Sequence, residues 1–202
     1  LERLAADPDV VSIGVDGRGG PALNSSVPFI RADQVHASGF TGEGITVAVL
    51  DSGIDTNHPD LSDDIAPGAR TFLFQGGTES AGAEDTTGHG TGVAGIITSK
   101  GTVASPGVAP DADILAVKVF DGSSGWISDW TAGVDYVVSV AGDYDRLCAI
   151  NMSLVSDQLF TQCPADNAAT YNQALQAAIL TARNAGIVTF AATGNDGSCN
   201  SM

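Results

Sequence analysis

The sequence predicts an α/β fold in which a mostly parallel sheet carries helices on both faces. Residues 45–50 are apolar or β-branched throughout, which is typical of a strand buried on both faces of a parallel sheet. Further short apolar runs follow, separated by stretches with helical spacing. Asp51 stands where the first strand ends. Because the functional crevice of an open α/β sheet lies outside the carboxyl ends of its strands, this carboxylate is placed for chemistry.

Four helices and three more strands are expected along the chain. The helical stretches repeat apolar or small residues on one side or end at a glycine, and the strands are short apolar runs. Ser128 is expected to cap the third helix. The expected helices span residues 32–38, 89–98, 129–141 and 167–184, and the expected strands span residues 111–120, 147–153 and 187–192.

Composition and charge limit the classes of function. The 202 residues, 43% of them hydrophobic, suit one globular domain. The net charge is −16 with only 8 Lys and Arg, so no nucleic acid partner is expected. The sequence contains no apolar run of about 18 residues, so no membrane span is expected. A nucleotide-binding domain is disfavoured because Asp51-Ser52-Gly53 stands where a Gly-x-Gly-x-x-Gly loop would be needed.

Three polar side chains stand in short blocks of small residues. Asp51 follows the first strand, His89 lies in Gly-His-Gly-Thr-Gly at an expected helix start, and Asn195 lies in Gly-Asn-Asp-Gly after the last strand. An asparagine in such a turn often serves only because it tolerates left-handed geometry. Together, however, an acid, a histidine and an amide supply an orienting carboxylate, a general base and an oxyanion donor.

In their order along the chain these blocks resemble the subtilisin-like serine peptidase family, whose triad runs Asp, His, Ser. The segments Val117-Lys118-Val119 and Asn151-Met152-Ser153-Leu154 also match family strands. The resemblance implies that Asp51 orients the general base His89 and that Asn195 donates to the oxyanion hole. The family nucleophile lies in a Gly-Thr-Ser-Met-Ala block, and the 202 residues contain no such block.

The same resemblance implies a groove for a peptide. An exposed loop at residues 121–126 would offer a strand edge to an extended substrate through main-chain hydrogen bonds. Val155 stands where the family pattern has glycine, in one wall of the pocket for the residue before the cut, and is expected to narrow that pocket. The residues expected to bind substrate are Ser124, Gly125, Trp126, Ser153, Leu154, Val155 and Gly194.

No cofactor is expected for the chemistry, but a structural calcium ion is one interpretation of Asp60. The resemblance includes the His-Pro-Asp-Leu segment at residues 58–61, whose Asp binds calcium in many relatives. The loop at residues 100–110 lacks the paired asparagines expected nearby, and turn capping is the alternative role. Glu84 and Asp85 are interpreted as part of a solvated loop.

Residues 1–20 resemble the end of the family's inhibitory propeptide followed by a linker, with an ordinary N-terminal αβ unit as the alternative. Residues 21–202 are then the N-terminal part of the catalytic domain. Cys148 lies in an expected strand and is interpreted as a buried apolar residue. Cys163 and Cys199 suit an extracellular disulfide, either with each other or with a partner beyond Met202.

The resemblance therefore implies a secreted, monomeric serine endopeptidase that cleaves peptides or proteins and is inhibited by its own propeptide. Any secretion signal must precede Leu1, because no signal peptide is recognisable at the start of the sequence. Since the nucleophile is absent, the chain alone is expected to be inactive. The alternatives are a non-catalytic pseudoenzyme that binds peptides and one chain of a split peptidase.

Overall fold

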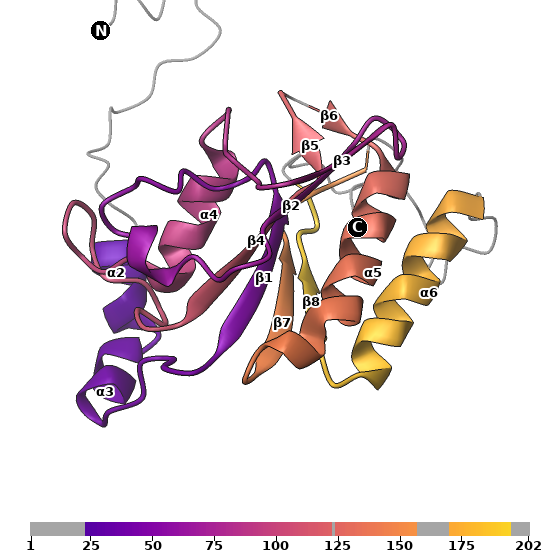
Figure 1. The fold of residues 1–202 in the computed structure, drawn as a ribbon. Helices are drawn as coiled ribbons and strands as arrows, with labels where there is room; N and C mark the ends of the chain where they lie inside the picture. The colour runs from indigo at the N-terminus through magenta and orange to yellow at the C-terminus, as the bar shows by residue number, and fades with distance from the viewer. Residues whose placement is uncertain (1–22, 123, 157–169, 195–202) are drawn as a thin grey trace, which may run out of the picture.

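The computed structural model describes residues 23–122, 124–156 and 170–194 and confirms the α/β prediction (Figure 1). Its strands are β1 (Thr46–Asp51), β2 (Arg70–Leu73), β3 (Thr78–Ala81), β4 (Asp113–Lys118), β5 (Phe120–Asp121), β6 (Ser124–Gly125), β7 (Leu147–Met152) and β8 (Val188–Ala191). Its α-helices are α2 (Leu23–Phe29), α3 (Ala32–Ala37), α4 (His89–Thr98), α5 (Ile127–Val140) and α6 (Thr170–Asn184). Short 3-10 turns occupy Ser62–Asp64 and Ala141–Asp143.

A six-stranded sheet in the order β3-β2-β4-β1-β7-β8 forms the centre of the described structure. Its neighbouring strands are parallel except for the β2–β3 pair. Helices α5 and α6 cover one face, and α4 lies on the other face together with α2 and α3 (Figure 1). The carboxyl ends of the parallel strands therefore meet at one edge, as the sequence predicts.

The two sheet faces have separate cores because side chains alternate along each strand. Ala48 and Leu50 of β1 belong to the cluster that packs against α5 and α6, whereas Val49 belongs to the cluster that packs against α4. The strand β4 divides in the same way, with Leu115 and Val117 on the α5 side and Ile114 on the α4 side. A strand buried on both faces explains the unbroken apolar runs in the sequence.

The start of α5 differs from the prediction. The helix begins at Ile127, and the extended residue Trp126 (φ −104°, ψ 141°) occupies the capping position without a side-chain hydrogen bond. The prediction that Ser128 caps this helix is therefore wrong. The carboxylate of Asp129 in the first turn instead accepts hydrogen bonds from the backbone N–H groups of Gln75 and Gly76, at the tip of the β2–β3 hairpin.

Other boundaries follow the prediction within a few residues, and α4 has the predicted ends. The strand predicted at residues 111–120 ends at Lys118, and the loop predicted at residues 121–126 contains part of a small hairpin, β5–β6. Cys148 is a free thiol that is partly rather than fully buried. Cys163, Cys199 and the propeptide-like residues 1–20 lie outside the described residues, and their roles stay predictions.

None of the described helices is both long and apolar enough to cross a membrane.

Candidate active site

The strand β1 carries Asp51 to the carboxyl edge of the sheet. The side chain of Asp51 is 0% exposed, and its Oδ1 accepts a hydrogen bond from the backbone N–H of Ser52 at 2.7 Å. The other carboxylate oxygen, Oδ2, is buried and has no hydrogen-bond partner among the described residues. The site therefore contains a carboxylate that solvent does not reach and that retains accepting capacity.

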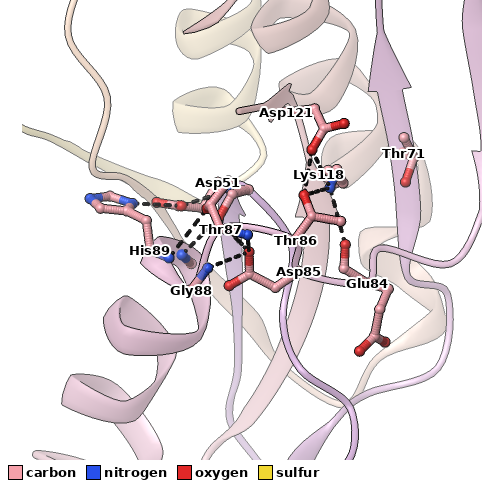
Figure 2. A network of polar contacts seen from close by, with 12 residues as sticks. Asp51, Thr71, Glu84, Asp85, Thr86, Thr87, Gly88, His89, Lys118 and Asp121 are labelled. Carbon is pink, nitrogen blue, oxygen red and sulfur yellow. Dashed lines mark hydrogen bonds and ion pairs between the residues drawn. The ribbon is translucent and has the colours of Figure 1, made fainter. Parts of the chain in front are cut away.

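His89, the first residue of α4, faces this carboxylate. Its Nδ1 lies 2.7 Å from Oδ1 of Asp51 (Figure 2). A neutral ring that donates from Nδ1 keeps Nε2 as an acceptor, which is the tautomer that a general base requires. The side chain of His89 is 52% exposed, and the ring of Phe120 lies tilted against it with the centroids 6.1 Å apart. The predicted pair of acid and base is thus assembled in the structure.

Gly90 allows α4 to approach the strand end so closely. A Cβ atom at Gly90 would lie 2.1 Å from the carbonyl oxygen of Gly53 and 3.0 Å from Oδ1 of Asp51. Gly53 itself has a φ of +101°, a conformation that side-chain-bearing residues rarely adopt. Gly90 is therefore required by the short distance between strand and helix, and Gly53 by its backbone conformation.

Asp85 holds the turn that leads into His89. Its Oδ1 accepts the backbone N–H groups of Thr87 at 2.9 Å and Gly88 at 3.0 Å (Figure 2). Its Oδ2 accepts the N–H and the hydroxyl of Thr91 at 3.0 and 2.6 Å. Burial acts to raise the pKa of Asp85, but these hydrogen bonds outweigh it and hold the pKa well below its usual range. The carboxylate is therefore ionised and satisfies the free N–H groups of Gly88 and Thr91 at the start of α4.

Ser52 connects this turn to the strand that carries Asp51. Its hydroxyl donates to Oδ1 of Asp85 at 2.9 Å and accepts the N–H of Gly90 at 2.9 Å. The interpretation of Glu84 and Asp85 as a solvated loop therefore holds for Glu84, which is exposed, and is wrong for Asp85, which is partly buried and bonded into this turn. The signal that could have identified it is an Asp followed by Thr-Thr-Gly before a helix, because short polar side chains there bond to the backbone a few residues on.

Three of the predicted substrate-binding residues lie on the β5–β6 hairpin or directly after it. Ser124 and Gly125 form β6, and Trp126 follows with a side chain that is 53% exposed. A Cβ atom at Gly125 would lie 2.6 Å from both Phe120 Cβ and the carbonyl oxygen of Val119, so the hairpin is too tight for a side chain there. The hairpin follows β4, which pairs with β1 along its whole length. It therefore lies at the same edge as the acid and base.

The remaining predicted substrate-binding residues follow β7 and β8. Leu154 packs against the core on the α5 side, whereas Val155 is 49% exposed. Ser153 directly follows β7, and Gly194, with a φ of +101°, follows β8. Asn195 lies outside the described residues, so its oxyanion role stays a prediction. The structure brings the acid and the base together, and the substrate roles of the other residues stay predictions as well.

The surroundings of Asp60 do not fit a calcium site. This carboxylate is fully buried and accepts the backbone N–H groups of Thr102, Val103 and Ala104. Calcium binds where six to eight oxygen atoms converge, whereas here N–H donors point at the carboxylate. In the part of the chain that the structure describes, no three His, Cys, Asp or Glu residues gather in a group that could hold a metal ion. The geometry corresponds to the alternative role, turn capping.

Comparison with known proteins extends these observations. Residues 42–202 match the profile of the Subtilase family, Peptidase S8. The chain is 33% identical to subtilisin E of Bacillus subtilis (strain 168) over an alignment of 207 residues, which covers 100% of this chain and 48% of that protein. It is 37% identical to the major intracellular serine protease of the same organism over 183 residues, covering 87% of this chain and 50% of that protein.

Solved structures are also similar to this chain. The protein named Sphericase matches with a TM-score of 0.66 and 33% identity, over 78% of this chain and 48% of that one. The S41 psychrophilic protease matches with a TM-score of 0.65 and 33% identity over the same shares. The chain thus spans about half the length of the curated relatives that it matches.

Proposed function

The chain belongs to the subtilase family, and from that membership we propose that the complete protein is a serine endopeptidase whose triad includes Asp51 and His89. The observation that carries the proposal is the 2.7 Å contact between a fully buried carboxylate and a half-exposed imidazole. The serine of this triad would come from polypeptide outside the 202 residues.

In this mechanism His89 Nε2 takes the proton of the serine hydroxyl as that oxygen attacks the peptide carbonyl, and later returns it to the leaving amine. Asp51 keeps the imidazole in the correct tautomer and stabilises the imidazolium that forms. Because Asp51 is buried, water screens this interaction little. Asn195 would donate to the oxyanion, which is negative only in and around the transition state.

We further propose that the substrate is an extended peptide or protein segment that adds to the free edge of β6. In the described residues β6 pairs only with β5, so its other edge is available. The residues before the cut would lie between this edge and the segment Ser153–Val155 after β7. The protein's own propeptide would inhibit the enzyme by binding in the same groove. Peptide hydrolysis itself would require no metal ion.

We propose an extracellular, monomeric enzyme. One of the matched relatives is named as intracellular, so family membership alone does not decide the location. Fractionating the producing cells and detecting the protein in medium and lysate would test it.

The edge strand β8 fits the main proposal and also a second candidate, one chain of a split peptidase. Its residues Val188 and Phe190 are 54% and 60% exposed, although both are apolar. Further polypeptide packed on this edge would bury them, and it could belong to the same chain or to another one. The pseudoenzyme that only binds peptides is the third alternative.

A fluorophosphonate probe, which labels activated serines, tests the proposal on the full-length protein after its propeptide has been released. We expect one labelled serine beyond residue 202, lost in His89→Ala, and no label on the isolated 202-residue chain. Absence of label on a folded, full-length protein would support the non-catalytic alternatives. Label on a serine inside the 202 residues that depends on His89 would overturn the assignment of the nucleophile to another segment.

A further inference from the structure

Two segments converge on one buried lysine beside the catalytic pair. Lys118 is the last residue of β4 and the register partner of Asp51 on β1. Its side chain is only 7% exposed. On one side it meets residues 84–86, which lead into the turn before His89, and on the other side Asp121, which belongs to the β5–β6 hairpin (Figure 2).

The contacts use the full donor capacity of the ammonium group. Nζ of Lys118 donates to the carbonyl oxygen of Glu84 at 3.1 Å, to Oγ1 of Thr86 at 3.1 Å and to Oδ1 of Asp121 at 3.2 Å. The hydroxyl of Thr86 donates in turn to the same Asp121 oxygen. Three N–H donors therefore meet three acceptors, and two of those acceptors are also bonded to each other.

Stability alone does not explain why a lysine occupies this buried position. Removing a lysine ammonium from water costs several kcal/mol, and an apolar side chain of similar volume would often stabilise a buried position as well or better. What the lysine adds is geometry, because it fixes residues 84–86 against Asp121. The hairpin needs such an anchor, since its strands have only two residues each and an isolated short hairpin is at best marginally stable.

We propose that Lys118 is a positioning residue that sets the distance between the substrate-binding edge of β6 and the general base His89. This inference rests on the proposed function, because it concerns how an extended peptide reaches the catalytic pair. A substrate that occupies several residues of the edge needs this distance to be fixed. A short substrate would fill only the pocket for the residue immediately before the cut and would not extend along the edge.

The test compares two substrates in the full-length enzyme: a tetrapeptide p-nitroanilide and a single-residue ester with the same residue before the cut. In Lys118→Met we expect kcat/KM for the tetrapeptide to fall about tenfold, mainly through a higher KM. This loss is smaller than the roughly 10²-fold loss that a 1 Å misplacement of the reacting groups causes, because the catalytic pair itself stays in place. We expect the ester to change by less than about twofold. Thr86→Val and Asp121→Asn, at exposed positions, should shift the same ratio in the same direction, so the test does not depend on the buried variant folding.

Lys100→Met is the matched control. Lys100 also bridges two segments, through ion pairs with Asp64 at 2.9 Å and Asp111 at 3.1 Å, but it lies near the amino end of β4. Its removal should lower stability without changing the ratio of the two kcat/KM values. In addition, Thr86→Val should cost little more in a Lys118→Met background, because both changes break the same network.

An equal loss for both substrates, or no loss for either, would overturn the inference and leave Lys118 with a structural role only. The same conclusion would follow if Lys100→Met changed the ratio as much as Lys118→Met. If the unmodified enzyme cleaves neither substrate and takes no fluorophosphonate label, it is the proposed function that fails.

Discussion

Each end of helix α4 is held by a carboxylate that accepts backbone N–H groups and by a lysine that bridges two segments, but the neighbouring residues differ. At its start, Asp85 accepts the backbone N–H groups of Thr87, Gly88 and Thr91, and Lys118 bridges two segments. Beyond its end, Asp60 accepts the N–H groups of residues 102–104 and Lys100 bridges two segments. In both places a carboxylate accepts hydrogen bonds from backbone N–H groups for which the backbone supplies no acceptor.

The difference lies in what the held segments carry. The network at the start of α4 adjoins the half-exposed imidazole of His89 and the buried Asp51, whose Oδ2 has no partner among the described residues. At the other end both oxygens of Asp60 are bonded, and neither these bonds nor the ion pairs of Lys100 involve any of the predicted catalytic or substrate-binding residues. Similar networks therefore adjoin turns and loops at one end and the proposed catalytic pair at the other.

The largest effect should come from removing the carboxylate at the catalytic end. In Asp85→Ala the turn before His89 loses its acceptor, and we expect kcat of the full-length enzyme to fall roughly 10²-fold, the size that a misplacement of about 1 Å produces. Asp60→Ala should lower the melting temperature but leave kcat within about twofold, because distant sites act independently. Steady-state kinetics and thermal unfolding of both variants measure this.

Asp85→Asn provides the control, since an amide oxygen can still accept from part of the turn and should recover much of the rate. If Asp60→Ala reduced kcat as strongly as Asp85→Ala, the contrast between the two ends would be wrong. A loss of rate in Asp85→Ala with an unchanged pH profile of kcat/KM would point to position rather than to protonation of His89.

The apolar framework could be predicted from the sequence because it depends on local patterns. Strands buried on both faces give unbroken apolar runs, and α4 has its predicted ends. The β2–β3 hairpin could not be predicted, since β3 (Thr-Glu-Ser-Ala) is mostly exposed and has no apolar repeat. The predicted start of α5 was wrong for a related reason: Asp129 binds the tip of that hairpin, which is more than 50 residues away in sequence.

The contact between Asp51 and His89 could be predicted from the sequence, whereas the long-range contacts that support it could not. Asp51 and His89 follow from a strand end and a helix start at one sheet edge, but the bonds of Asp85 to Ser52 and of Lys118 to Thr86 join residues 33 and 32 positions apart. Such contacts depend on how turns fold against each other. A sequence pattern does not contain that information, because many residues could occupy the same turn.

Substitution of Val155 should have the next largest effect, and it should change specificity rather than the rate itself. Val155 is 49% exposed and makes none of the network contacts at either end of α4. We expect the full-length enzyme to favour Ala, Val or Leu over Phe or Tyr before the cut, and Val155→Gly to restore aromatic preference by roughly tenfold, since a few methylenes are worth ~1–3 kcal/mol. Values of kcat/KM on peptides varied at that one residue test this. An unmodified enzyme that prefers Phe as strongly as the glycine variant would contradict it.

The acid stability of the Asp60 end should show a smaller effect, without any change in activity at neutral pH. Burial raises the pKa of Asp60, but the N–H donors of Ala104, Thr102 and Val103 outweigh it and lower the pKa to about 2 from a usual value of 3.8. A lowered pKa means that the stabilisation is present above about pH 4 and is lost as the pH falls through about 2.

Urea unfolding of Asp60→Asn and of its parent, both in a His89→Ala background that prevents self-digestion, measures this contribution. The difference between their unfolding free energies should be largest near pH 6 and shrink between pH 4 and 2. A difference that stays constant across this range would mean that the N–H groups stabilise the amide and the carboxylate equally.

The smallest expected effect is the response of this end to calcium. For an ion to bind Asp60, the N–H groups of Thr102, Val103 and Ala104 would have to turn away and oxygen ligands would have to replace them. The loop already satisfies the carboxylate, so adding millimolar calcium or EDTA should leave the unfolding midpoint of the His89→Ala protein unchanged. Asp60→Asn should lower that midpoint by the same amount with and without calcium. If calcium raised the midpoint of the parent and not of Asp60→Asn, Asp60 would be a calcium ligand and the likeness between the two ends of α4 would fail, because one end would be held by a metal ion and the other by backbone amides alone.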